Sequence, residues 1–155
     1  MKDNKNWVDY FIKIASAVKT KSKDPSTKIG AVIVGEDNEI VSTGYNSFPR
    51  GLNDEIAERF ERPEKYNWFE HAERNSIYNA ARIGVSVKGC TIYLTCGLPC
   101  IDCARGIINS GISKIVCKKG ENKSHGLKGK HWEENISKAE EMLEEADIDI
   151  EYYED

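Results

Sequence analysis

The sequence predicts an α/β protein in which helices cover both faces of a mixed β-sheet. Apolar, β-branched runs alternate along the chain with stretches of helical periodicity, and only a short polar turn separates the first two runs. Alternating strands and helices are typical of parallel strands joined by crossover helices, and the initial hairpin adds an antiparallel pair. A length of 155 residues suits one compact core, so we expect residues 1–155 to form a single domain.

The first part of the chain predicts a helix, a hairpin and a long loop. Apolar side chains recur at helical spacing over residues 4–21, and the Asp-Pro pair at 24–25 ends that pattern. Strands are predicted at 29–34 and 39–45. Residues 46–66 contain two prolines among many charged residues, which favours a long surface loop with one short helix.

The rest of the chain predicts three successive units of a helix followed by a strand. Pro99 suits the first turn of a helix, and glycines at 84 and 111 are typical of positions just after a helix. The expected elements are a helix at 68–82, a strand at 91–95, a helix between Pro99 and Gly111, a strand at 114–117, a helix at 133–146 and a strand at 148–153.

The composition excludes several classes of protein. Hydrophobic residues make up 39% and charged residues 31%, so an extended disordered chain is excluded. No apolar run approaches the ~20 residues that span a bilayer, and the N-terminus lacks the apolar stretch of a signal peptide. We therefore expect a soluble, cytoplasmic protein without a membrane partner.

The formal net charge of −4 is unevenly distributed. Residues 133–155 carry eleven acidic side chains and one lysine, whereas residues 1–132 have a net charge of +6. A positive body suits an anionic small substrate at least as well as a nucleic acid. The same charges also fit a solvated acidic helix beside an ordinary lysine-bearing surface.

Three residues have the spacing of a catalytic metal site. His71 lies at the start of one predicted helix, and Cys100 and Cys103 lie at the start of the next. One nitrogen and two sulfurs are a ligand set for catalytic zinc, which keeps a fourth position open for water. The C-x-x-C spacing spans nearly one helical turn, and a helix N-terminus stabilises thiolates. The sequence therefore predicts Zn²⁺ at this site.

Glu73 completes a recognisable pattern. It follows His71 by two residues, so near a helix start it can face the site without being a ligand. A carboxylate beside an activated water is placed to take its proton and pass it on. The combined signature, H-x-E followed by P-C-x-x-C, is that of zinc-dependent nucleobase deaminases.

Other interpretations of these residues remain open at this point. Cys100 and Cys103 also fit a redox pair or two core cysteines, and Cys100 with His71 fits a nucleophile–base pair. Cys96 is close enough in sequence to be a fourth ligand, which would make the zinc structural. A second metal site is a weaker alternative, because its candidate ligands are scattered: Cys90, Cys117, His125 and His131.

The sequence resembles the cytidine/deoxycytidylate deaminase superfamily, and most of all its deoxycytidylate (dCMP) deaminase branch, from residue 24 to residue 116. The segments that carry the resemblance are Asp24-Pro-Ser-Thr-Lys-Ile-Gly-Ala-Val-Ile-Val34, Gly44-Tyr-Asn-Ser-Phe-Pro-Arg-Gly51, His71-Ala-Glu-Arg-Asn-Ser-Ile77, Ala80-Ala-Arg82, Gly89-Cys-Thr-Ile-Tyr-Leu-Thr95 and Pro99-Cys-Ile-Asp-Cys-Ala-Arg105. The resemblance implies a three-layer α/β/α sandwich around a five-stranded mixed sheet. It also implies hydrolysis of dCMP to dUMP and ammonia, with Glu73 as the proton shuttle.

The resemblance implies substrate contacts by position. Asn46 is implied to hydrogen-bond the sugar or phosphate end of the substrate, although an asparagine after a strand also commonly forms the turn. The backbone at Ala72 and Thr95 is implied to read the pyrimidine edge. The other implied contacts, which also fit ordinary surface side chains, are Ser26, Thr27, Lys28 and Arg50 at the phosphate or nucleotide face and Arg82 at the nucleotide pocket or a subunit interface.

Two positions depart from the pattern of the superfamily. Ser47 stands where the usual G-Y-N-G motif has its second glycine, and the strand at 114–117 is not followed by the aromatic residue that many members have. Trp132 either supplies the missing stacking surface or packs at the start of a helix.

The resemblance further implies a homo-oligomer, often a hexamer, and regulation by dCTP and dTTP, with Mg²⁺ attending the regulators. Rival functions are a tRNA adenosine deaminase, a free (deoxy)cytidine deaminase and a non-catalytic, zinc-stabilised binding module. The D-P-S-T-K, G-Y-N and F-P-R-G segments favour the dCMP branch, and the acidic C-terminal helix argues against a nucleic-acid partner.

Overall fold

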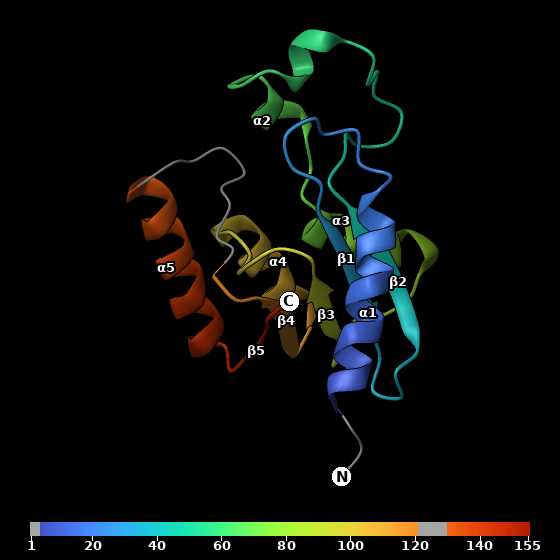
Figure 1. Ribbon diagram of the computed structural model, residues 1–155, viewed down its shortest axis with the longest axis vertical. Coiled ribbons are helices and arrows are strands. Elements are labelled where there is room, and N and C mark those ends of the chain that lie inside the picture. Colours follow the sequence, from blue (N-terminus) through green and yellow to red (C-terminus); the bar gives the residue numbers. More distant parts are fainter. Residues whose placement is uncertain (1–3, 121–129) are drawn as a thin grey trace.

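A five-stranded mixed sheet forms the centre of the protein in the computed structural model, which describes residues 4–120 and 130–155 (Figure 1). The strand order is β2-β1-β3-β4-β5. β1 pairs antiparallel with β2 and β3, and β3, β4 and β5 are parallel, as a hairpin followed by helix–strand units predicts. The strands are β1 (Gly30–Val34), β2 (Ile40–Tyr45), β3 (Thr91–Leu94), β4 (Lys114–Lys118) and β5 (Asp149–Tyr153).

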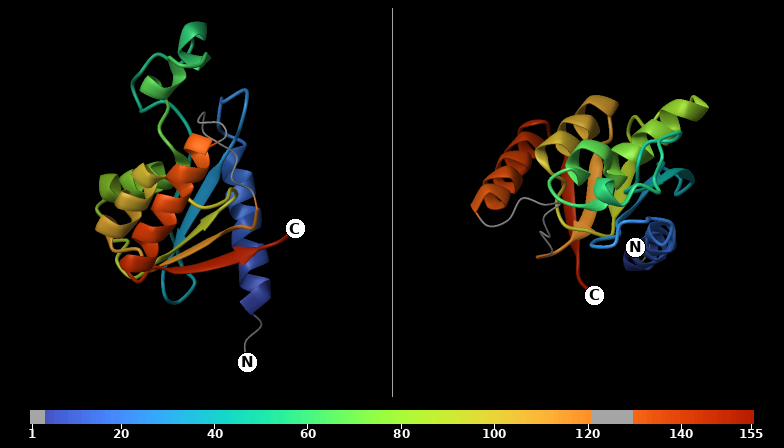
Figure 2. Two further views of the ribbon diagram at one scale, coloured as in Figure 1. Left: turned by 90° about the vertical axis from the view of Figure 1, so that its left-hand side faces the viewer. Right: turned by 90° about the horizontal axis from the view of Figure 1, so that it is seen from above.

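Helices cover both faces of this sheet, so the molecule has three layers (Figure 2). Among the described residues, α1 packs on one face, and α3, α4 and α5 pack on the other. The helices are α1 (Asn4–Lys19), α3 (Ala72–Ile83), α4 (Ile101–Ser110) and α5 (Lys130–Glu145). The predicted three-layer α/β/α sandwich is confirmed.

The central strand β1 shows why both faces need a cover. All five of its residues are buried. Successive side chains of a strand point to opposite faces, so Ala31 and Ile33 join the core under α3, α4 and α5, whereas Val32 and Val34 join the core under α1. A strand without a polar face is stable only inside such a sandwich.

The predicted helix over residues 68–82 is wrong at its start. A short helix, α2 (Lys65–Trp68), ends before Phe69, and α3 begins only at Ala72. Phe69 is extended and packs against Phe48 and Phe60, with ring centroids 4.6 and 5.5 Å away. These aromatic contacts outside the helix replace the continuous helical pattern, and they leave His71 as the N-cap residue of α3.

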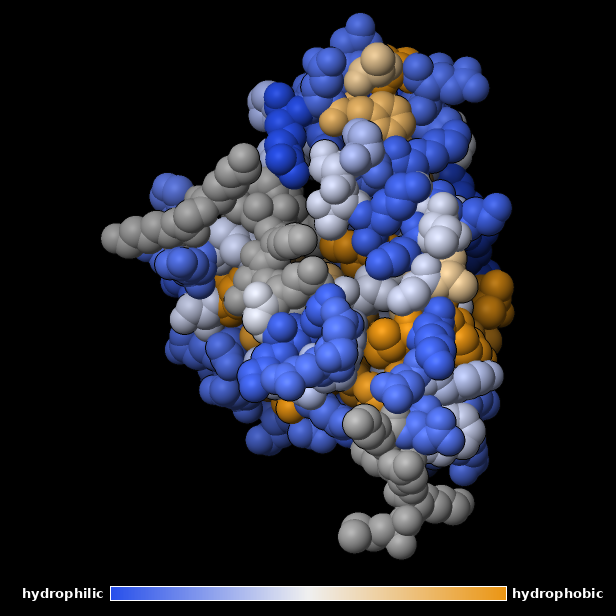
Figure 3. Space-filling model, in the orientation of Figure 1, coloured by the Kyte–Doolittle hydropathy of each residue, from blue (hydrophilic) through white to orange (hydrophobic). Residues whose placement is uncertain are grey.

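Residues 46–70, called the insert here, form a compact projection beyond the sheet (Figures 1 and 2). The insert contains η1 (Ala57–Phe60) and α2, so the predicted surface loop carries more helix than expected. Its two ends meet at an isolated bridge, where the Ser47 N–H donates to the Glu70 carbonyl at 3.1 Å and the Glu70 N–H donates to the Ser47 carbonyl at 2.8 Å. In the space-filling view its outer surface is largely hydrophilic (Figure 3).

Within the described residues, no helix has both the length and the apolar character needed to cross a membrane. His125, one of the weaker metal-ligand candidates, lies outside the described residues.

Candidate metal centre and catalytic site

His71, Cys100 and Cys103 converge where the N-termini of α3 and α4 meet. The His71 Nδ1 atom lies 3.5 Å from Cys100 Sγ and 3.4 Å from Cys103 Sγ, and all three ligand atoms lie within 4.8 Å of one another. Zn–N bonds of about 2.0 Å and Zn–S bonds of about 2.3 Å at a tetrahedral ion separate nitrogen from sulfur by about 3.5 Å. The donor set therefore fits one zinc ion.

Helix capping explains why two of these side chains are available as ligands. His71 and Cys100 are the N-cap residues of α3 and α4, and both have extended backbone conformations. Neither side chain makes the capping hydrogen bond that serine or aspartate makes at this position. Both side chains are thus directed to the cluster rather than to their own helix.

Close packing of α3 on β2 fixes the position of this helix. A Cβ atom at Gly44 would lie 2.4 Å from the Ser76 nitrogen and 2.7 Å from the Ala72 carbonyl oxygen. Only glycine allows this approach, and α3 carries both His71 and Glu73. Gly44 in β2 therefore determines how far the site residues lie from the sheet.

The electrostatics of the cluster also suit a cation. A hydrogen bond with the Cys103 thiol lowers the pKa of Cys100 to about 4, with His71 adding to the effect against the opposing effect of burial. Burial raises the pKa of Cys103 well above its ordinary value, and the neighbouring Cys100 adds to this shift. A metal ion would compensate the negative charge of both thiolates at once.

Glu73 lies beside the ligands and is completely buried. Burial raises the pKa of its carboxyl group, while the nearby His71 opposes the shift. Its Oε1 atom accepts a hydrogen bond from the Cys96 thiol at 3.6 Å, and its Oε2 atom has no hydrogen-bond partner among the described residues. Buried polar atoms normally have a hydrogen-bond partner, so we expect a bound ligand or water to donate a hydrogen bond to this oxygen.

Cys96 is not part of the ligand cluster. Its thiol contacts the Glu73 carboxylate, and the described residues that can hold an ion together are His71, Cys100 and Cys103. The fourth-ligand alternative is therefore not supported, and three protein ligands leave one position for water.

A cavity of about 330 Å³ opens from the cluster toward the insert. It combines the ligands with polar, charged and aromatic side chains, as small-molecule sites do. Its lining residues are Asp24, Thr27, Asn46, Arg62, Lys65, Tyr66, Phe69, Glu70, His71, Arg74, Cys100, Asp102, Trp132 and Asn135.

Asn46 lines this cavity, but its side chain is fully engaged inside the protein. Its Oδ1 atom accepts a hydrogen bond from the Ile29 N–H at 2.8 Å. Its Nδ2 atom donates to the Thr27 carbonyl at 2.8 Å and to Asp24 Oδ2 at 3.2 Å. Asn46 therefore holds the loop that precedes β1, and its contact with substrate stays a prediction.

The backbone positions implied to read the base stay predictions as well. Ala72 is buried at the start of α3, beside the metal cluster. The hydroxyl of Thr95 accepts a hydrogen bond from the Gly30 N–H at 3.0 Å, which ties the end of β3 to β1.

Of the predicted phosphate contacts, Thr27 lines the metal cavity, but the structure does not bring the others to it. Ser26 and Lys28 are exposed and do not line it, and Arg50 and Arg82 line a different cavity. Sequence reasoning missed Arg62, Lys65 and Arg74, which line the metal cavity instead. Only the position of Arg74 next to the H-x-E motif signalled such a role, because the fold of the insert decides where the other two point.

Trp132 was expected either to pack at the start of a helix or to supply a stacking surface, and its position is compatible with both. It is buried in the core under α3, α4 and α5, so it packs at the start of a helix. It also lines the metal cavity, where stacking on a bound base stays a prediction.

Comparisons with known proteins agree with this site. Residues 5–119 match the family model of the cytidine and deoxycytidylate deaminase zinc-binding region. The match covers most of the chain and includes the three candidate ligands and Glu73. The fold and the site thus define a zinc-binding deaminase domain, and the chain belongs to the cytidine and deoxycytidylate deaminase family.

Curated relatives share substantial sequence identity with the chain. An uncharacterized deaminase encoded in the luxG 3′ region of Aliivibrio fischeri is 40% identical over 144 residues, covering 93% of this chain and 91% of that protein. Deoxycytidylate deaminase of Mus musculus is 38% identical over 119 residues, covering 74% of this chain. The chain spans about 65% of the length of the mouse protein.

A solved structure supports the fold. The dCMP deaminase of cyanophage S-TIM5, in complex with dCMP and dUMP, superposes with a TM-score of 0.74. The superposition covers 99% of both chains at 22% sequence identity. The whole three-layer arrangement is therefore shared despite extensive sequence divergence.

Proposed function

We propose that the chain is a single zinc-dependent domain that hydrolyses dCMP to dUMP and ammonia. The observation that carries this proposal is the buried Glu73 Oε2 atom, which has no hydrogen-bond partner in residues 4–120 and 130–155 and lies beside a three-ligand metal cluster whose His71 and Cys100 line a cavity. The deoxycytidylate deaminases among its relatives support the choice of substrate.

In this proposal His71, Cys100 and Cys103 hold the zinc ion. When bound, zinc supplies the positive charge that makes a water molecule acidic enough to react near neutral pH. Because the described residues supply three ligands at this cluster, a tetrahedral ion would keep one position for that water.

Glu73 moves the protons of the reaction. Its carboxylate takes a proton from the attacking water and delivers it to ring N3, which makes C4 electrophilic. The water oxygen bonds to C4 as a hydroxyl group. Glu73 then takes the remaining proton from this hydroxyl and gives it to the amino group, while the bond from C4 to the exocyclic nitrogen breaks and the C4 carbonyl forms. One water is consumed and one ammonia is released, so the carboxylate ends in its starting state.

A substrate panel tests the proposal. We expect ultraviolet absorbance to report deamination of dCMP in preference to CMP, dCTP, deoxycytidine and 5-methyl-dCMP. A tRNA anticodon stem is the parallel substrate for an adenosine deaminase. Preference for deoxycytidine or for the tRNA stem would assign the site to the corresponding rival, and a zinc-loaded protein inactive on all of them would support the binding module.

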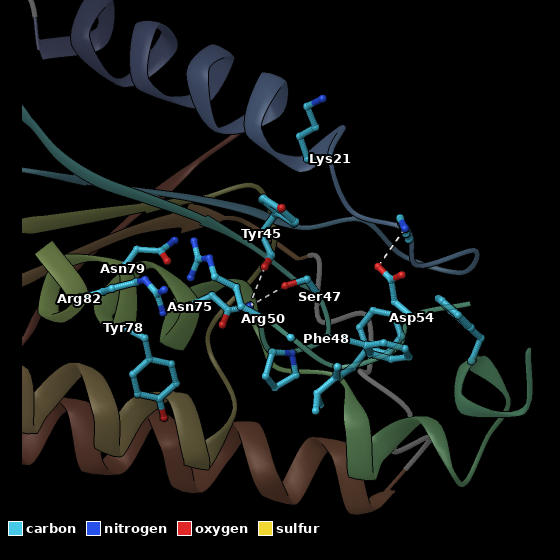
Figure 4. A pocket seen from close by; sticks show the side chains of 16 residues that line it. Lys21, Tyr45, Ser47, Phe48, Arg50, Asp54, Asn75, Tyr78, Asn79 and Arg82 are labelled. Carbon is cyan, nitrogen blue, oxygen red and sulfur yellow. Dashed lines mark hydrogen bonds and ion pairs between the residues drawn. The ribbon is translucent and has the colours of Figure 1, made fainter. Parts of the chain in front are cut away.

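Regulation by dCTP and dTTP is part of the same proposal. A second cavity of about 480 Å³ lies between the end of β2, α3 and the insert (Figure 4). It offers the basic side chains of Lys21, Arg50 and Arg82 and the rings of Tyr45 and Tyr78, which suit a phosphorylated nucleotide. We expect added dCTP or dTTP with Mg²⁺ to change the rate of dCMP turnover by the wild type, and Arg82→Gln to abolish this response. No response in the wild type would contradict the proposal.

Assembly and location complete the proposal. We expect a homo-oligomer, with a hexamer as the specific expectation, and a cytoplasmic location. Sedimentation equilibrium and cell fractionation are the measurements, and a monomer at micromolar concentration would contradict the first expectation.

A further inference from the structure

Charged side chains of both signs line the metal cavity. Asp24, Glu70 and Asp102 supply negative charge, and Arg62, Lys65 and Arg74 supply positive charge. A nucleotide monophosphate brings two negative charges to such a cavity, so the carboxylates oppose its binding unless they are compensated.

Two of the three cations are occupied by carboxylates of the same cavity. Lys65 Nζ lies 2.6 Å from Asp24 Oδ2, and these side chains are only 8% and 4% exposed. Arg74 donates from Nε to Glu70 Oε1 at 2.7 Å. Burial makes the first pair persistent, because separating it would leave two uncompensated charges away from water.

The third carboxylate is compensated from outside the cavity. Asp102 is paired with Arg105, one turn further along α4. All three carboxylates of the cavity wall therefore already have a cationic partner.

Arg62 is the exception among these cations. It is exposed, and within residues 4–120 and 130–155 it makes no ion pair or side-chain hydrogen bond. It belongs to the insert and lines the same cavity as the ligands His71 and Cys100. The pairing of the other charges leaves its guanidinium as the uncompensated positive group of the described wall.

We propose that Arg62 is the specificity-determining residue that recognises the 5′-phosphate of the substrate. This inference rests on the proposed function, in which the cytosine ring lies at the metal cluster and the phosphate lies at the opposite end of the nucleotide. The planar guanidinium offers two parallel N–H donors that match two phosphate oxygens. A nucleoside has no such group, so Arg62 separates dCMP from deoxycytidine.

The test compares two substrates in one variant. Arg62→Gln should lower kcat/KM for dCMP by about 10- to 100-fold, the usual effect of losing a charge-assisted hydrogen bond, and should raise KM more than it lowers kcat. The kcat/KM for deoxycytidine should change by less than about twofold. Arg62→Lys should recover part of the loss, because it restores the charge but not the paired donors.

Arg59→Gln is the matched control. Arg59 belongs to the same insert, but its guanidinium lies 3.7 Å from the Trp68 ring centroid and Arg59 does not line the cavity. Its loss removes the same charge from the insert and should leave the ratio of dCMP to deoxycytidine activity unchanged.

The outcomes separate this inference from the proposed function. A wild-type protein that deaminates dCMP, with an unchanged substrate ratio in Arg62→Gln, overturns the role of Arg62 alone. Equal losses for both substrates in Arg62→Gln also overturn it, since they indicate a general effect on the insert. A wild-type protein inactive on both substrates overturns the proposed function first.

Discussion

Glu73 is the residue on which the proposed chemistry depends. Glu73→Gln keeps the volume of the side chain and its contact with Cys96 but removes the group that accepts a proton. We expect kcat for dCMP to fall by about 10³-fold or more, which is the range for loss of a general acid–base group. Steady-state kinetics measure the loss.

Zinc content distinguishes a proton shuttle from a metal ligand. Glu73→Gln should retain zinc in metal analysis, because Glu73 is not among the residues that can share the ion. His71→Ala is the contrasting variant and should lose both zinc and activity. Near-wild-type turnover in Glu73→Gln would falsify the mechanism.

Cys117 gives the stability of the protein a pH dependence. It is completely buried in β4, and burial raises the pKa of its thiol to about 12. In the unfolded chain the thiol ionises near pH ~8.5, so between these values the native state binds more protons than the unfolded state. The free energy of unfolding should therefore decrease as the pH rises above about 9.

Urea unfolding at pH 8.5, 9.5 and 10.5 tests this dependence. Cys117 contributes a slope of at most about 1.4 kcal/mol per pH unit, and Cys117→Ala should reduce the measured slope. The comparison uses slopes, because the substitution also removes buried volume at every pH. An identical slope in the two proteins would contradict the assignment.

At the scale of the element, the contact between β2 and α3 is the most sensitive one near the site. In Gly44→Ala the new methyl group would lie 2.4 Å from the Ser76 nitrogen, so α3 must move away from the sheet. We expect a loss of about 1–3 kcal/mol in unfolding free energy. We also expect weaker zinc retention, because His71 is the N-cap of that helix.

Gly106→Ala is the matched control in α4. Its Cβ atom would lie 3.5 Å from the Arg74 side chain, an ordinary van der Waals contact. Alanine in a helix interior is also favoured over glycine by about 0.5–1 kcal/mol, so this variant should be as stable as the wild type or more stable. Equal effects of the two variants would show that α3 does not depend on the close approach.

The insert depends on one buried ion pair. Lys65→Met removes the partner of Asp24 and leaves a carboxylate that is 4% exposed without its cation. We expect a loss of about 3 kcal/mol or more in thermal or urea unfolding. The double variant Asp24→Asn, Lys65→Met should lose less than the two single variants combined, and simple additivity would show that the pair contributes no coupling.

The elements differ in how far the sequence determines them. The metal ligands and Glu73 were predictable because they form two short motifs of recognisable spacing at helix starts, although the packing of α3 and α4 is what brings the two motifs together. The start of α3 was not predictable from the sequence, because Phe69 contacts the rings of Phe48 and Phe60, and no local sequence pattern reveals these contacts. Lys65 was equally hidden, since lysine is rarely buried unless it is paired.

At the scale of the whole molecule, the metal site lies between two helices, α3 and α4, that are also fixed by their packing in the apolar core. α3 and α4 both contribute to the apolar core on one face of the sheet, in addition to the three ligands. We therefore expect removal of zinc by a chelator to lower the melting temperature while the far-ultraviolet circular dichroism at 25 °C stays native. Re-addition of zinc should restore the melting temperature and the activity together.

This result separates a catalytic centre from a structural one. A protein whose fold is supported by the ion alone unfolds in the chelator, as small zinc domains do. Complete unfolding of this protein at 25 °C would therefore favour the binding module over the enzyme.

The bridge between Ser47 and Glu70 has a practical consequence. Because the backbone leaves and re-enters the sandwich at neighbouring points, the whole insert could be replaced without moving the strand and helix that flank it. Exchange of this segment for one of different length and chemistry would alter what enters the cleft without relocating the zinc ligands. Grafting between homologues at these two joints is thus a direct route to new substrate preferences.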